Sequence, residues 1–214
     1  MQIELHAIGD KAFDQACRAI KAALDDCPRE DHRHGIIHDC LPTPEGIQIC
    51  RDYHIQMPMQ SAFIGWKQEP DDYLEHILGH DRLEKLNPIR TFRDNNIVVS
   101  FGSDAPCTTP DPIAWMDRAV NNDNAGQAVS VQDALQMCTY NGAWAAFDEQ
   151  ERGSLEAGKI ADMAVLSENP YTVPKDKLSG LRVERLYLSG KSYESCRESI
   201  LPMMLRGLTS RNKA

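Results

Sequence analysis

Two histidines and an aspartate have the side chains and the placement that a metal ion needs. His6, His38 and Asp104 each lie at or near the end of a segment with a strand-like pattern. Two neutral imidazoles and a carboxylate are a common ligand set for Zn²⁺ or a similar divalent ion, and such an ion lowers the pKa of its water to about 7. The same residues also fit a structural role, in which each histidine is hydrogen-bonded near a strand end and Asp104 caps the next segment.

The other residues that could do chemistry give weaker signals. His32 and His34 have the spacing that puts two imidazoles on one strand face, but they follow the charged stretch Arg29-Glu30-Asp31, so we interpret them as part of a solvated turn. The Gly102-Ser103-Asp104 stretch lacks the G-x-S-x-G pattern of a nucleophile elbow. Three further histidines fall in helical or loop patterns and are expected at the surface: His54, His76 and His80.

Strand-like and helix-like segments alternate through the first two thirds of the chain. Parallel strands need crossover connections, and a helix is the usual one, so four strand–helix units in a row predict a parallel sheet and an α/β fold. The predicted strands cover residues 3–8, 33–39, 55–63 and 97–104, and the predicted helices cover residues 11–24, 45–53, 73–78 and 88–95.

The chain has a different pattern after the fourth predicted strand. Two helices are expected, one near residues 113–121 and one that begins at Ser130, an N-cap with Asp133 three residues later. Residues 160–166 and 183–188 have the pattern of strands in a small β element. The sequence therefore predicts three parts: a barrel-like part over residues 1–150, part of a composite β domain over residues 151–193, and a C-terminal helix and tail over residues 194–214.

The predicted parallel strands each have a polar and an apolar face. Residues of equal parity share a face, so His6 lies with Glu4 while Leu5 and Ala7 point the other way. This split suits a barrel whose outer side packs on helices and whose interior opens into a site at the C-terminal strand ends. The 214 residues are too few for a complete (β/α)8 barrel with an appended domain, since the barrel alone takes about 250 residues.

Four motifs follow one another along the chain. They are His6-Ala7-Ile8-Gly9-Asp10-Lys11-Ala12, Ile36-Ile37-His38, Phe101-Gly102-Ser103-Asp104-Ala105-Pro106 and Gly153-Ser154-Leu155-Glu156-Ala157-Gly158-Lys159-Ile160-Ala161-Asp162. In this order and spacing they resemble the metal-dependent amidohydrolase superfamily. The nearest branch is the amidohydrolase-3 family, which includes N-substituted formamide deformylase-like enzymes, and the resemblance covers most of residues 2–193.

The resemblance implies a fold and a reaction. The fold is a partial (β/α)8 TIM-type barrel, equivalent to strands 5–8, with part of a small β domain. His6 and His38 are implied as metal ligands at barrel strands 5 and 6, and Asp104 at strand 8 as the residue that contacts the metal and carries the proton. The implied activity is hydrolysis of a C–N bond in an amide-type small molecule by metal-activated water, with zinc as the expected divalent metal.

The chain departs from the family pattern in two places. The strand-1 H-x-H motif and the strand-4 bridging residue have no counterpart, because the chain begins where strand 5 is expected. Around His38, Ile37 and Asp39-Cys40 stand where the family has Glu and Ala-Gln. We therefore expect the C-terminal part of an amidohydrolase. The alternative function is a non-catalytic fragment or structural half-barrel that lacks the ligands of strands 1–4.

Composition excludes several kinds of partner. The chain has 23 basic and 32 acidic residues, a net charge of −9, and no basic block, which argues against nucleic acid and anionic membranes. No apolar run reaches the about 18 residues of a membrane span, and the N-terminus lacks a secretory pattern, so we expect a cytoplasmic protein. The seven cysteines, without a C-x-x-C pair, predict reduced and mostly buried thiols.

A partial barrel also predicts self-association. Its two edges, near Leu5 and near Phe101, would each leave a row of backbone groups unpaired that a closed barrel satisfies. We therefore expect a homodimer or another form of self-association. One symmetric solution is a parallel eight-strand ring about a two-fold axis.

Overall fold

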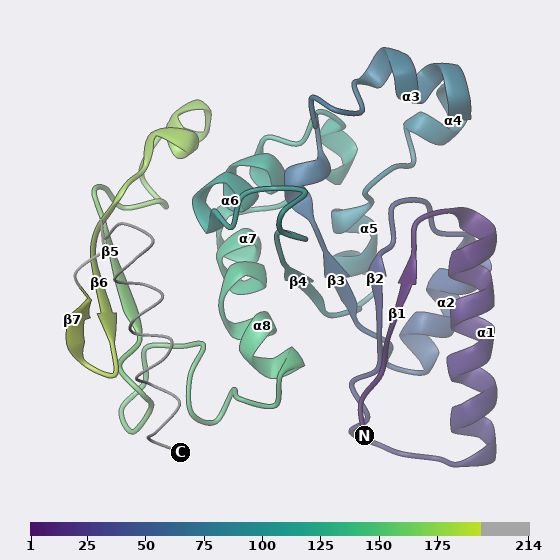
Figure 1. Cartoon of the computed structure of the whole chain (residues 1–214), viewed down its shortest axis with the longest axis horizontal. Helices are drawn as coiled ribbons and strands as arrows, with labels where there is room; N and C mark the ends of the chain where they lie inside the picture. The colour runs from purple at the N-terminus through teal and green to yellow at the C-terminus, as the bar shows by residue number, and fades with distance from the viewer. Residues whose placement is uncertain (194–214) are drawn as a thin grey trace, which may run out of the picture.

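The computed structural model describes residues 1–193 (Figure 1). Its first part is a layer of four parallel strands, in which β1 pairs with β2 and β3 pairs with β4. A parallel bridge between Gly35 and Gln56 connects the two pairs, so the strands follow one another in chain order. The strands are β1 (Glu4–Ala7), β2 (Gly35–His38), β3 (Met57–Met59) and β4 (Val99–Phe101). The predicted α/β class and the parallel pairing are therefore confirmed.

Helices α1 (Asp10–Asp26) and α2 (Pro44–Asp52) lie together on one side of β1 and β2 (Figure 1). The buried positions of α1 recur every three or four residues, as expected of a helix that packs one face on a core. Thr43 caps α2 by accepting a hydrogen bond from the backbone nitrogen of Gly46 at 3.0 Å. A side chain at Gly46 would collide with the ring of Phe13, so this glycine permits the close contact of the two helices.

Three helices connect β3 to β4, and three more follow β4. The first group is α3 (Asp71–Leu78), α4 (His80–Leu83) and α5 (Ile89–Asp94), and the second is α6 (Pro112–Val120), α7 (Val131–Cys138) and α8 (Tyr140–Ala145). Helices α3 and α4 lie beyond the carboxyl ends of the parallel strands (Figure 1). The predicted capping box at the start of α7 is present, since Ser130 and Asp133 each accept a hydrogen bond from the other's backbone nitrogen.

A small antiparallel sheet forms after α8. It contains β5 (Met163–Leu166), β6 (Val183–Leu188) and β7 (Lys191–Tyr193), in that order. The strands predicted over residues 160–166 and 183–188 are therefore confirmed, with the first one shorter. The connection between them includes the 3₁₀ turn η3 (Lys175–Gly180), which buries Leu178 completely in the core shared with the parallel layer. The division into domains stays a prediction.

The interpretation of the stretch from His32 to His34 as a solvated turn is wrong. The stretch is buried rather than solvated, with 8% of the Arg33 side chain exposed. The two terminal nitrogens of Arg33 donate to the two carboxylate oxygens of Glu149 at 2.8 and 2.9 Å. The guanidinium also lies 4.5 Å from the ring centroid of Trp144. The charged Arg33 side chain can be buried here because two carboxylates pair with it, Asp31 two residues earlier and Glu149 116 residues later.

Several further sequence predictions can be compared with the structure within residues 1–193. Within residues 1–193 the parallel layer does not close into a ring, since β1 pairs only with β2 and β4 only with β3. No helix in this range is both long and apolar enough to cross a membrane. The cysteines in this range are free, and Cys17 and Cys50 are fully buried while Cys27 and Cys107 are exposed, so the expectation of mostly buried thiols holds only in part. The predicted C-terminal helix and tail, residues 194–214, lie outside the described range.

Candidate functional site

The structure brings His6 and His38 together at the carboxyl ends of β1 and β2. The two strands are parallel neighbours in which His6 pairs with Ile37 and Ala7 pairs with His38. The imidazole ring centroids are 4.6 Å apart, and the ring planes are 80° to each other. His6 is exposed while His38 is 6% exposed, so the pair joins a solvent-facing ring to a buried one.

Gln60 fixes the orientation of the His38 ring. Its Oε1 atom lies 2.6 Å from Nδ1 of His38, and its Nε2 atom donates to the backbone oxygen of Pro58 at 3.4 Å. Because the amide nitrogen is used by Pro58, the oxygen faces the imidazole, and Nδ1 of His38 must be the donor. This pairing assigns the tautomer in which Nε2 keeps its lone pair, which is the form that binds a metal.

The backbone takes an uncommon conformation where the candidate residues lie. His38 has φ of 78°, Asp39 has 50° and Asp104 has 52°, all in the left-handed region that residues other than glycine rarely adopt. Six other non-glycine residues of the described range share this region, and His and Asp enter it more readily than most residues, so the conformation marks tight turns and not by itself a site. The ends of β2 and β4 are therefore built as special turns, and the sequence pattern gave no sign of this.

Asp104 follows β4 and is exposed. Its backbone oxygen accepts a hydrogen bond from the nitrogen of Cys107 at 2.8 Å. The next helix, α6, is capped by Asp111, which accepts from the backbone nitrogens of Ile113 and Ala114 at 3.1 and 3.3 Å. That Asp104 caps the segment directly after it stays an alternative. Desolvation and the Asp104 carboxylate together raise the pKa of the neighbouring Cys107 thiol, so this carboxylate already has a partner in the turn.

The described residues supply two neighbouring imidazoles and no complete metal-binding group. The two imidazoles suit a zinc-like ion, but a catalytic zinc usually takes three protein ligands and leaves a fourth position open. Within residues 1–193, no group of three His, Cys, Asp or Glu side chains is arranged to hold a metal ion. The structure therefore unites His6 with His38 and does not add Asp104 as a third ligand. The assignment of all three residues as metal ligands stays a prediction.

Asp39 lies directly after His38 and is completely buried. Neither of its carboxylate oxygens has a hydrogen-bond partner among the described residues. Burial raises the pKa of the Asp39 carboxyl well above its usual range, and the nearby Cys17 thiol adds to this shift. Burial thus disfavours the charged form of Asp39, which directly follows His38 in the chain.

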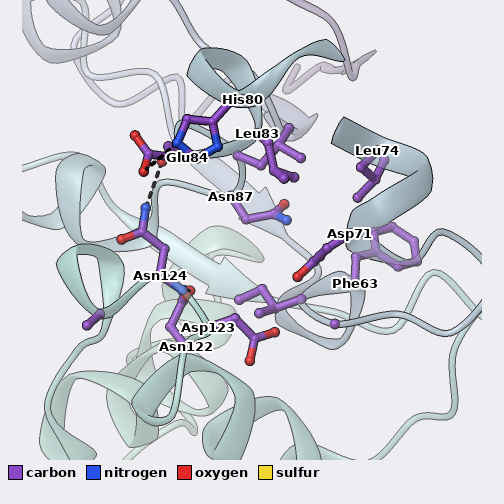
Figure 2. Close-up of a pocket in the computed structure, with 14 residues that line it drawn as sticks. Phe63, Asp71, Leu74, His80, Leu83, Glu84, Asn87, Asn122, Asp123 and Asn124 are labelled. Carbon is purple, nitrogen blue, oxygen red and sulfur yellow. Dashed lines mark hydrogen bonds and ion pairs between the residues drawn. The ribbon is translucent and has the colours of Figure 1, made fainter. Parts of the chain in front are cut away.

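Sequence reasoning did not single out two residues that touch His38. Gln60 was recognisable as a polar residue close to the end of the third strand, which is where site residues of parallel sheets gather. Phe63 had no such signal, because it is an apolar residue in the 3₁₀ turn η1 (Ser61–Phe63). Its ring stacks on His38 with centroids 5.9 Å apart, and it also lines a cavity of about 310 Å³ (Figure 2).

Known proteins match this chain along most of its length. N-substituted formamide deformylase of Arthrobacter pascens is 33% identical over 152 residues, which cover 68% of this chain and 26% of that protein. YtcJ of Bacillus subtilis (strain 168) is 26% identical over 202 residues, which cover 89% of this chain and 37% of that protein. The chain spans about a third of the length of the curated relatives it matches.

A solved structure and a family model also match this chain over most of its length. The crystal structure of an uncharacterized metal-dependent hydrolase from Pyrococcus furiosus has a TM-score of 0.69 and 25% sequence identity, over 80% of this chain and 34% of that one. The amidohydrolase family model matches residues 1–193, which contain all four motifs noted in the sequence. The resemblance predicted from those motifs is thereby confirmed, and the chain belongs to the amidohydrolase family.

Proposed function

We propose that this chain is part of a metal-dependent hydrolase that cleaves a C–N bond in an amide-type small molecule. The observation that carries the proposal is the pair of imidazoles 4.6 Å apart at the ends of neighbouring parallel strands. The hydrogen bond from His38 to Gln60 supports it, since histidine ligands of metals nearly always donate their second ring nitrogen to such an acceptor. Two imidazole ligands favour zinc among the biological divalent ions.

Each residue of the site has a defined task in this proposal. His6 and His38 would hold the metal, and Gln60 keeps His38 in the tautomer that does so. When bound, a divalent metal supplies a Lewis acid that polarises the carbonyl and acidifies water. Asp104, after the parallel strand β4, lies toward the same end of the layer and would take a proton from water at its carboxylate. It would then return that proton to the leaving nitrogen.

We also propose that the four parallel strands correspond to strands 5–8 of a (β/α)8 barrel. Support comes from their parallel order and from the placement of the histidine pair at their carboxyl ends. β1 and β4 are the end strands of the described layer, so a second copy could pair with them. Light scattering after size exclusion is expected to give twice the 24.0 kDa chain mass, and a monodisperse single-chain mass would contradict self-association.

The second candidate function is a non-catalytic half-barrel. It is favoured by one observation, the lack of a three-residue metal group among the described residues. Such a chain would fold and associate without holding zinc at the histidine pair. Metal content therefore separates the two candidates.

Elemental analysis of the purified full chain tests the proposal. After zinc loading and dialysis without chelator, about one equivalent is expected in the wild type, and much less in His6→Ala and in His38→Ala. His76→Ala is the matched control, because it removes an exposed imidazole from α3 and should keep the zinc. Zinc below about a tenth of an equivalent in the wild type, or equal zinc in all variants, would support the half-barrel. Amine release from N-substituted amides, measured on the same samples, tests the reaction.

A further inference from the structure

The side chain of His34 binds the backbone at the start of β1. Its Nδ1 atom accepts a hydrogen bond from the backbone nitrogen of Ile3 at 3.2 Å, directly before β1 begins at Glu4. The backbone is joined at the same point, since the nitrogen of Gly35 donates to the oxygen of Ile3 at 3.0 Å. Ile3 is therefore tied to the start of β2 through both its amide nitrogen and its carbonyl oxygen.

His32 holds the backbone of His34 in turn. Its Nδ1 atom accepts from the backbone nitrogen of His34 at 2.8 Å. Its Nε2 atom lies 2.8 Å from the backbone oxygen of Tyr53, the residue that ends α2, and must donate to it because a carbonyl oxygen has no proton. The two histidines are buried, with ring centroids 4.5 Å apart. Three hydrogen bonds therefore join the end of α2 to the start of β1 through two imidazoles.

The bond to Ile3 requires an unprotonated Nδ1 in His34. An imidazole nitrogen that carries a proton can only donate, so a protonated ring would direct a second N–H group at the N–H group of Ile3. The protonated ring would also place a charge at a buried position. The bond to Ile3 and the protonation of His34 therefore exclude each other.

The surroundings of His34 disfavour its protonation. Burial lowers the pKa of the His34 ring, and His32, Arg29 and the amino group of Met1 lower it further. These neighbours are cationic or become so when they bind a proton. The folded chain therefore favours the neutral ring that the bond to Ile3 needs.

No nearby group offsets this preference. The other charged or titratable groups on the segments around His34 are Glu4, Asp31, Arg33, Tyr53 and Glu149. Arg33 is paired with Asp31 and Glu149, and the Tyr53 hydroxyl donates to Asp25. Glu4 is exposed, and the next strand approaches with Gln56, which has no charge.

We propose that His34 is a pH-sensitive positioning residue, which holds β1 on β2 while its ring is neutral and releases the start of β1 when the ring is protonated. Among the described strands β1 pairs with β2 alone, so its position depends on these contacts. His6 lies on β1 opposite Ile37, and the register that His34 fixes also sets the spacing of His6 and His38. This link to the metal site rests on the proposed function, whereas the release of β1 does not.

The direction of the pKa shift sets the pH window. The released ring binds a proton more readily than the bonded ring, because only the bonded ring is buried beside cations. The stabilisation of β1 is therefore complete above pH about 6.5, the ordinary pKa of histidine, and is lost as pH falls through the lowered pKa.

Amide hydrogen exchange of the full chain, followed by nuclear magnetic resonance and expressed as protection factors, tests the proposal. Protection of the Ile3 amide should fall at least about tenfold from pH 7 to pH 5 in the wild type. His34→Asn should keep its protection within about twofold, because the asparagine oxygen takes the place of Nδ1 as acceptor and binds no proton. His34→Phe removes the acceptor and should leave the Ile3 amide weakly protected at both pH values. His76→Asn is the matched control, since it removes an exposed imidazole from α3 and should keep the wild-type pH dependence.

Three results would overturn the inference. They are equal protection of Ile3 at pH 7 and pH 5 in the wild type, the wild-type loss in His34→Asn, and a loss of the pH dependence in His76→Asn.

Zinc tests the link to His6. A metal that joins His6 to His38 also holds β1 on β2, so zinc at pH 7 should raise the protection of the Ile3 amide in the wild type and not in His6→Ala. Unchanged protection in a chain that holds zinc would overturn this link. The pH dependence in a chain that holds no zinc would refute the proposed function alone, and zinc binding without the pH dependence would refute this inference alone.

Discussion

The Nδ1 atom of His38 lies 2.6 Å from the Oε1 atom of Gln60. This contact decides which ring nitrogen of His38 carries the proton, because the amide nitrogen of Gln60 is directed to the backbone oxygen of Pro58. The lone pair of Nε2 is thereby kept for a ligand, and Phe63 stacks on the face of the ring with the centroids 5.9 Å apart. The site is therefore supported by contacts outside the predicted ligand set.

Replacing Gln60 should weaken metal binding without unfolding the protein. Gln60→Leu removes the acceptor of the His38 proton, so zinc affinity should fall about 10-fold to 100-fold. Gln60→Glu keeps an acceptor oxygen at the same position and should retain most of the affinity. Competition titration with a chromogenic chelator measures both variants. Equal affinities for Gln60→Leu and the wild type would mean that this hydrogen bond does not position a ligand.

The buried ion pair between Arg33 and Glu149 should be a large contributor to stability when one partner is removed. Their side chains are 8% and 11% exposed, so Glu149→Gln would leave the buried Arg33 charge with the mostly exposed Asp31 as its remaining carboxylate partner. The free energy of unfolding should fall by about 1.5–3 kcal/mol, the range for a lost hydrogen-bonded charge partner. Lys21→Met, which breaks the exposed pair with Asp25, is the control and should cost less than about 1 kcal/mol. Urea unfolding measures both changes, and similar losses would contradict the role of burial.

The same pair should make stability depend on pH in the acid range. The hydrogen bonds from Arg33 hold the pKa of the Glu149 carboxyl below its ordinary value of 4.5. A folded-state pKa below the unfolded one means that the unfolded chain binds the proton more readily, so the stabilisation is complete above pH about 4.5 and is lost as pH falls through the folded-state pKa. The stability difference between the wild type and Glu149→Gln should therefore be constant from pH 7 to about pH 5 and narrow toward pH 3. A constant difference down to pH 3 would contradict the lowered pKa.

Local pattern predicted most of the elements but not their long-range pairings. The helix over residues 10–26 and the strand over residues 183–188 follow from spacings within a few residues, and both are found close to the predicted bounds. The burial of Arg33 did not follow from the sequence because Glu149, the buried one of its two carboxylate partners, is 116 residues away. The meeting of His6 and His38 followed from the rule that parallel strands end at one edge. No such rule gives the distance from β2 to a side chain in the turn after β4, so the position of Asp104 relative to the histidines did not follow from the sequence.

Anomalous X-ray diffraction from crystals of the zinc-loaded full chain tests the central claim most directly, because it locates the metal and its ligands together. The account predicts one zinc peak about 2.0–2.1 Å from Nε2 of His38 and from a ring nitrogen of His6. Nδ1 of His38 should remain hydrogen-bonded to Gln60, as it is at 2.6 Å here. A zinc peak at another histidine such as His76, or density showing both rings of the pair without a metal at full zinc saturation, would contradict the claim that His6 and His38 form the metal-binding core of this amidohydrolase.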